Sequence, residues 1–121
     1  MSVTIFRVVV RGMFADLTPE CRERLLAEAP QHDIFDSAYT AAGTFTYEPR
    51  LEAFSFRFEI RENSDESDSP TQVEANAIAR GESAAVDYLA SNGIGFKRIR
   101  TSATNMADMW RPSGNEDVSD R

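Results

Sequence analysis

The feature that most constrains the fold is the segment 52–61, in which large apolar residues alternate with polar ones. Phe54, Phe56, Phe58 and Ile60 occupy every second position of this segment. Because side chains on a strand point alternately to opposite faces, the spacing predicts a strand with one buried face. Full burial of each of these side chains stabilises the folded state by roughly 1.5–3 kcal/mol. Together they therefore determine which face of the strand packs against the core.

Three other segments are predicted to be strands, because β-branched and aromatic residues alternate in them, and two are predicted to be helices. Thr18 before Pro19 is typical of a helix start, and Pro30 is typical of a helix end. In the second helix, Gly81 indicates a close contact between helix and sheet. In chain order the predicted elements cover residues 3–11, 19–29, 38–47, 52–61, 71–91 and 96–104.

This order predicts an α+β domain with the ferredoxin-like βαββαβ arrangement, a four-stranded antiparallel sheet with two helices on one face. Right-handed crossovers place the first and third strands side by side at the centre of the sheet. The chain of 121 residues fits a single domain, which we expect over residues 2–112. The segment 62–70 is acidic and rich in serine, so it is predicted to be a mobile loop outside the core, and 113–121 to be a disordered polar tail.

The outward face of the predicted sheet is rich in arginine. Guanidinium groups bind carboxylates and phosphates with two parallel hydrogen bonds, so this face is a candidate site for an anionic small molecule. Three interpretations stay open: such a ligand site, a solvated sheet face, and the face of a homodimer or of another protein interaction. Phe96 and Ser102 are predicted to share this face. The candidate ligand-binding residues are Arg7, Arg11, Arg57, Glu59, Arg61, Arg98 and Arg100.

Composition argues against several classes of partner. The net charge of −7 argues against nucleic acid, as does the lack of aromatic residues on the open face of the two predicted central strands. No apolar run approaches the roughly 20 residues needed to cross a bilayer, and the N-terminus lacks the features of a secretory signal. The single cysteine, Cys21, excludes an internal disulfide and is predicted to fill the core. We therefore expect a cytoplasmic chain with no membrane partner.

No motif specifies a reaction, so whether the chain is an enzyme stays open, with the balance against it. The only catalytic candidates are weak: His32 and Asp33 could form a general base with its orienting acid, although a loop histidine is more often structural. The loop after Arg11 has one glycine where the phosphate loop of acylphosphatase would lie, which argues against that activity. The acids of 62–70 lack the glycine and final glutamate of a calcium loop. The sequence implies no metal and no cofactor.

The last apolar segment is unusual, because chain ends are normally polar. Met106, Met109 and Trp110 are expected to dock, where they would cover a sheet edge, close a pocket as a lid, or contact a second subunit.

Four segments resemble a family of small actinobacterial domains of unknown function, over roughly residues 3–111. The Met-Ala-Asp-Met-Trp-Arg ending is the most specific part of the resemblance. Because that family has no assigned activity, the resemblance implies domain limits and an actinobacterial origin but no catalytic residue. The segments are Phe6-Arg7-Val8-Val9-Val10-Arg11-Gly12, Gly43-Thr44-Phe45-Thr46-Tyr47, Phe54-Ser55-Phe56-Arg57-Phe58-Glu59-Ile60-Arg61 and Thr104-Asn105-Met106-Ala107-Asp108-Met109-Trp110-Arg111.

Overall fold

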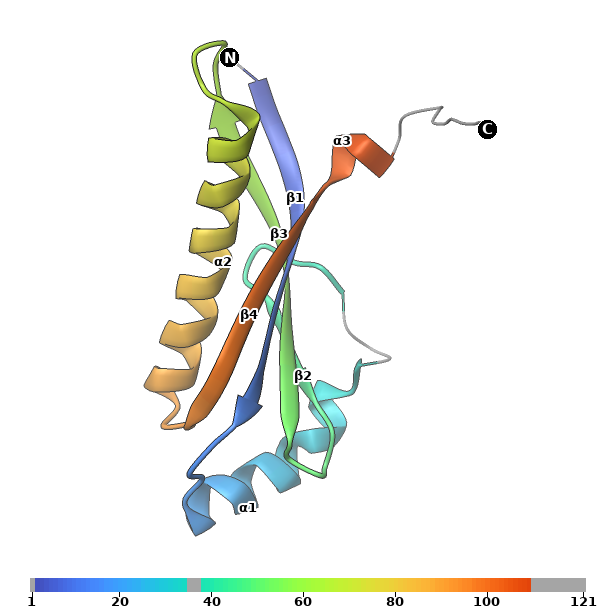
Figure 1. The fold of residues 1–121 in the computed structure, drawn as a ribbon. Helices are drawn as coiled ribbons and strands as arrows, with labels where there is room; N and C mark the ends of the chain where they lie inside the picture. The colour runs from blue at the N-terminus through green and yellow to red at the C-terminus, as the bar shows by residue number, and fades with distance from the viewer. Residues whose placement is uncertain (1, 35–37, 110–121) are drawn as a thin grey trace, which may run out of the picture.

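Four antiparallel strands form one open sheet in the order β2-β3-β1-β4 (Figure 1). The structure is a computed structural model, and it describes residues 2–34 and 38–109. The predicted α+β class, the antiparallel sheet and the central position of the first and third strands are confirmed. The strands are β1 (Ser2–Phe14), β2 (Thr44–Tyr47), β3 (Ala53–Ser64) and β4 (Phe96–Asn105). The helices are α1 (Pro19–Glu28), the 3₁₀ helix η1 (Ala29–His32), α2 (Pro70–Ser91) and α3 (Met106–Met109).

The inward face of the two central strands forms the core. Seven apolar residues that alternation places on this face of β1 and β3 are between 0% and 6% exposed, as predicted. They are Phe6, Val8, Val10, Phe54, Phe56, Phe58 and Ile60. Helix α2 lies along this face and contacts β1, β3 and β4 (Figure 1). A Cβ atom on Gly81 would lie 2.7 Å from Cγ1 of Val8, so the glycine allows the predicted close contact.

Helix α1 does not lie along the sheet beside α2, contrary to the prediction that both helices cover one face. It crosses the end of the sheet instead (Figure 1). The helix has 10 residues and buries only Cys21 and Leu25, so it has little apolar surface to spread over the strands. The Tyr47 hydroxyl donates a hydrogen bond to the carbonyl of Leu25 at 2.7 Å, and Arg24 donates one to the carbonyl of Asn92 at 2.5 Å. These two bonds join α1 to the ends of β2 and α2.

Strand β2 is shorter than the predicted 38–47. Before it, Thr40 makes a single parallel bridge with Phe58, and its carbonyl accepts a hydrogen bond from the amide of Glu59 at 2.8 Å. Gly43 has a φ of +92°, which turns the chain before the strand begins at Thr44. The turn at Gly43 therefore lies between the Thr40 bridge and the first residue of β2.

Strand β3 continues to Ser64, so the acidic segment does not begin at residue 62. Glu62 is 8% exposed and accepts a hydrogen bond from Nη1 of Arg80 at 2.5 Å. The prediction that Glu62 lies outside the core is wrong, because composition does not reveal that a basic residue on α2 faces this carboxylate. Beyond the strand, Asp65 accepts hydrogen bonds from the amide and hydroxyl of Ser67.

A β-bulge in β4 overturns the prediction that Phe96 faces outward. Between the pairs Arg11–Arg100 and Met13–Lys97 the register shifts, and Arg98 is left as the extra residue with a φ of +58°. The shift inverts the alternation, so Phe96 packs against the core and Lys97 takes the outward position. On the C-terminal side of the bulge, Ile99 and Ala103 are among the side chains predicted to face inward, and both pack against the core.

Candidate functional site

A row of four polar side chains crosses the outward face of the sheet. The strand register pairs Thr46 of β2 with Ser55 of β3, Ser55 with Arg11 of β1, and Arg11 with Arg100 of β4. All four therefore lie at one level of the sheet, with two hydroxyls at one end and two guanidinium groups at the other. We call these four residues the anion row.

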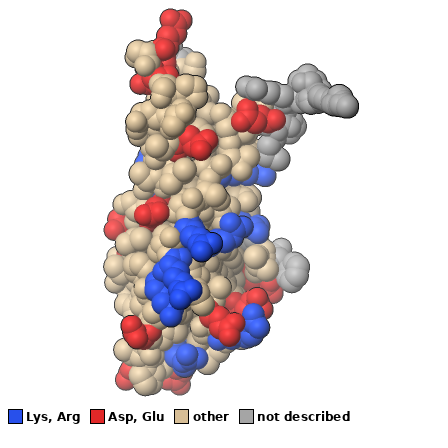
Figure 2. Space-filling view, viewed as in Figure 1, with Lys and Arg blue, Asp and Glu red and all other residues tan. Residues whose placement is uncertain are grey.

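At the arginine end of the row, two positive charges have no ion-pair partner among the described residues. Like charges at directly opposite positions of an antiparallel pair are destabilising. Within residues 2–34 and 38–109, neither Arg11 nor Arg100 makes a side-chain hydrogen bond or an ion pair, and both are exposed. Lys97 and Arg98 are exposed next to them, and Figure 2 shows basic side chains gathered over the lower half of β4. This end of the row can therefore accept an anion.

The hydroxyl end of the row lies in a cavity. Thr46 is only 2% exposed, and its Oγ1 lies 2.8 Å from Oγ of Ser55, so one hydroxyl donates to the other. A cavity of about 220 Å³ is lined by both of these residues and by Arg11, together with Ile34 and Glu48. It thus offers one guanidinium group and two hydroxyl groups to a small ligand.

Two of the predicted ligand-binding arginines contact an aromatic ring. The Tyr39 ring lies 4.7 Å from Cζ of Arg7 and 5.5 Å from Cζ of Arg57, which is the geometry of cation–π contacts. Arg7 is also the register partner of Glu59 across β1 and β3. The sequence analysis did not identify Tyr39 as a partner of these arginines, because the contact depends on how the segment before β2 lies across the sheet.

The two remaining predicted arginines are not members of the row. Arg61 is exposed at the far end of β3, where it is paired in register with Ile5. Arg98 is the bulge residue and does not follow the alternation of β4. Of the seven predicted ligand-binding residues, the row therefore contains Arg11 and Arg100, and it adds the hydroxyls of Thr46 and Ser55.

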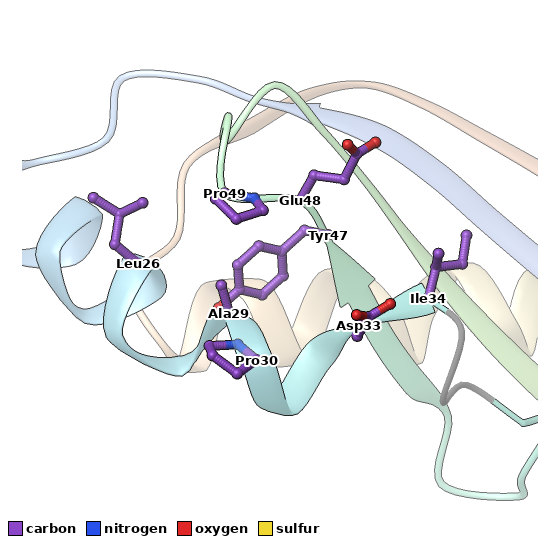
Figure 3. Close-up of a pocket in the computed structure, with 8 residues that line it drawn as sticks. All are labelled: Leu26, Ala29, Pro30, Asp33, Ile34, Tyr47, Glu48 and Pro49. Atoms are coloured by element: carbon purple, nitrogen blue, oxygen red, sulfur yellow. The ribbon is translucent and has the colours of Figure 1, made fainter.

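A second, larger cavity of about 630 Å³ lies between α1, η1 and the end of β2. Figure 3 shows Leu26 at one end of it, Ile34 and Asp33 at the other, and the Tyr47 ring between them. The lining is mostly apolar, and its two charged residues, Asp33 and Glu48, are both carboxylates. The two cavities share Ile34, Tyr47 and Glu48 in their walls, so they adjoin.

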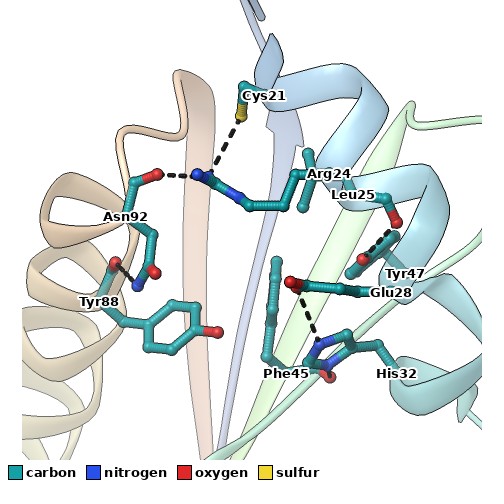
Figure 4. A network of polar contacts seen from close by, with 9 residues as sticks. All are labelled: Cys21, Arg24, Leu25, Glu28, His32, Phe45, Tyr47, Tyr88 and Asn92. Carbon is teal, nitrogen blue, oxygen red and sulfur yellow. Dashed lines mark hydrogen bonds and ion pairs between the residues drawn. The ribbon is translucent and has the colours of Figure 1, made fainter.

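His32 is held against β2 rather than exposed in a loop. Its Nδ1 lies 2.9 Å from the carbonyl oxygen of Phe45, to which it can donate, and its ring stacks on Tyr47 at 5.2 Å between centroids. The carboxylate of Glu28 lies 4.0 Å from its Nε2 (Figure 4). Asp33 lines the larger cavity. These contacts join η1 to β2, and the role of His32 and Asp33 as general base and orienting acid stays a prediction.

Tyr47 makes the protein sensitive to high pH. Burial, and then the Glu28 carboxylate, raises the pKa of Tyr47 from 10.0 to about 12. Because the folded state holds the neutral phenol, this contribution to stability is complete below pH 10 and is lost as the pH rises from 10 through 12. The same two causes raise the pKa of Tyr88.

We therefore expect the free energy of unfolding to fall between pH 10 and pH 12, and to fall less steeply in Tyr47→Phe. Urea unfolding at several pH values across this range measures both slopes. The substitution also removes the hydrogen bond to the Leu25 carbonyl, at a cost of about 1 kcal/mol at neutral pH. If the free energy of unfolding fell equally steeply with pH in the parent protein and in Tyr47→Phe, the raised pKa of Tyr47 would not be its cause.

Four further expectations concern the rest of the chain. Cys21 is buried, as predicted. Met106 is half-buried at the start of α3, whereas Trp110 and the side chain of Met109 lie outside the described residues. In the part of the chain that the structure describes, no helix combines the length and apolar character needed to span a bilayer. The same residues contain no group of three or more His, Cys, Asp or Glu side chains placed to hold a metal ion.

Comparison with known proteins assigns the chain to a family without assigning an activity. Neither the search of the curated proteins nor the search of the solved structures returned a match. A protein-family model described as a family of unknown function (DUF6204) matches residues 1–115, which is nearly the whole chain of 121 residues. The chain therefore belongs to the DUF6204 family of unknown function.

Proposed function

We propose that this protein binds a small anionic molecule at the anion row. The observation that carries the proposal is the register pair of Arg11 and Arg100, which puts two arginines at directly opposite positions with no acidic partner among the described residues. A bound carboxylate or phosphate would remove the repulsion between them and accept hydrogen bonds from both. Of the two hydroxyls of Ser55 and Thr46, the one that does not donate to the other would donate to a remaining oxygen atom of the anion.

A thermal-shift screen tests the proposal with inorganic phosphate and a panel of mono- and dicarboxylates, each against chloride at equal ionic strength. At least one anion should raise the melting temperature, because a ligand present at 100 times its Kd stabilises the folded state by about 2.7 kcal/mol. The double variant Arg11→Gln with Arg100→Gln should lose this stabilisation. The matched control Arg61→Gln removes an arginine from the same face, outside the row, and should keep it.

The same variants separate a binding role from a structural one. Without ligand, Arg11→Gln should be as stable as the parent protein or more stable, by up to about 1 kcal/mol, because it removes a like-charge pair. If Arg11 stabilised the fold, Arg11→Gln would instead be less stable than the parent protein. The proposal fails if no anion stabilises the protein beyond chloride, or if the double variant is stabilised as much as the parent.

Homodimerisation is the second candidate function, and one feature of β4 favours it. This edge strand has 10 residues, and its second half, 101–105, has no charged side chain to discourage pairing with another strand. A second copy could therefore add its own β4 there. Light scattering on the screened samples decides between the functions, since ligand binding alone leaves the mass at 13.5 kDa.

We also assign the architecture to the ferredoxin-like group. Two features support this assignment: the βαββαβ order along the chain, and β1 and β3 at the centre of the sheet. The position of α1 across the end of the sheet is a departure from that arrangement. Since this fold hosts many unrelated functions, the assignment adds nothing to the choice of ligand.

A further inference from the structure

The smaller cavity presents opposite charges to a ligand. Arg11 and Glu48 both line its wall, and within residues 2–34 and 38–109 neither side chain has an ion-pair partner. Glu48 is exposed, so its carboxylate is accessible. A simple anion would pair with Arg11 and leave Glu48 without an ion-pair partner. A ligand that carries both a negative and a positive group would satisfy both.

The adjoining cavity specifies what the rest of such a ligand should be. Leu26 and Ile34, which are 45% and 44% exposed, are two of the four large hydrophobic residues that are exposed in the described part of the chain. Both line the larger cavity, together with prolines and the Tyr47 ring. Its volume of about 630 Å³ is within the range of about 300–1,000 Å³ that is typical of small-molecule sites. Because its charged residues are both carboxylates, it suits an apolar group and disfavours an anion.

We infer that the ligand is an α-amino acid with an apolar or aromatic side chain. This inference rests on the proposed function, since it uses the anion row as the site of the α-carboxylate. Arg11 binds the carboxylate together with one hydroxyl of the Ser55–Thr46 pair, and Glu48 binds the α-ammonium group. The side chain extends past Ile34 and Tyr47, which belong to both cavities, into the larger one.

Isothermal titration calorimetry with three related probes tests this inference. L-Phenylalanine has all three groups, 3-phenylpropionate lacks the ammonium group, and phenethylamine lacks the carboxylate. We expect phenylalanine to bind at least tenfold more tightly than either analogue, and glycine, which has no side chain, to bind more weakly than phenylalanine. Glu48→Gln should reduce the affinity for phenylalanine to that for 3-phenylpropionate, and should leave the latter unchanged or increased.

The matched control is Glu52→Gln, which removes an exposed carboxylate that pairs with Arg50 and lines neither cavity. It should leave the affinity for all probes unchanged. If 3-phenylpropionate binds as tightly as phenylalanine and Glu48→Gln changes neither affinity, the amino-acid inference is wrong while the anion row stands. If phenethylamine binds in the Arg11→Gln variant as in the parent and no carboxylate binds, both proposals are wrong.

Discussion

Phe56→Ala should lower the free energy of unfolding by about 3–5 kcal/mol, the largest effect we expect from a single core substitution. The Phe56 ring is 2% exposed and lies on the inward face of β3. It stacks on Phe45 at 4.7 Å and on Phe58 at 6.1 Å between centroids, and meets Tyr88 edge to face. Its removal would leave a cavity between rings from three elements, β2, β3 and α2, which cannot all move into the space.

Urea unfolding measures this loss, with Val3→Ala as the control. Val3 is 55% exposed on β1, so its truncation should change the free energy of unfolding by less than about 0.5 kcal/mol. Phe56→Leu keeps most of the apolar volume and should cost less than Phe56→Ala. A loss below about 1 kcal/mol for Phe56→Ala would contradict the described packing.

Arg80→Leu should lower the free energy of unfolding by about 1–3 kcal/mol. The Glu62 side chain is only 10% exposed and pairs with Arg80 at 2.5 Å. The same Nη1 of Arg80 also donates to the carbonyl of Arg61 at 2.8 Å. Its loss leaves a poorly solvated carboxylate without its cation. The effect falls short of that of a fully buried pair, because the Arg80 side chain is 58% exposed.

The exposed pair of Arg50 and Glu52 provides the matched control. Its side chains are 70% and 63% exposed, so Arg50→Leu should cost less than about 1 kcal/mol. The double variant Arg80→Leu with Glu62→Leu should recover most of the stability that Arg80→Leu loses, because no unpaired carboxylate remains. Equal losses for Arg80→Leu and Arg50→Leu in urea unfolding would show that burial of Glu62 does not matter.

The core could be predicted from the sequence because it depends only on alternation within each strand. Phe54, Phe56 and Phe58 occupy every second position, and no other strand is needed to decide which face they share. The central position of β1 and β3 follows from element order and the handedness of crossovers. The position of α1 depends instead on hydrogen bonds to Tyr47 and Asn92, which are distant in sequence.

The anion row could be predicted only in part, because it depends on the register between strands. Alternation places Arg11, Ser55 and Thr46 on the outward face, but only the pairing of the strands brings them to one level. The bulge at Arg98 has no clear sequence signal, since an arginine at a positive φ is unexpected, and it changed which β4 residues face outward. Because a bulge adds one residue to a strand, the alternation on one side of it does not predict which residues face outward on the other side.

The most direct test of anion binding at the row is an NMR titration of the folded protein with inorganic phosphate, with chloride at equal ionic strength as the reference. We predict saturable shifts in the side-chain Nε–Hε signals of Arg11 and Arg100 and in the backbone amide of Ser55, with the Arg61 signals unchanged. Shifts that do not saturate, or that are as large at Arg61 as at Arg11, would contradict a site at the anion row.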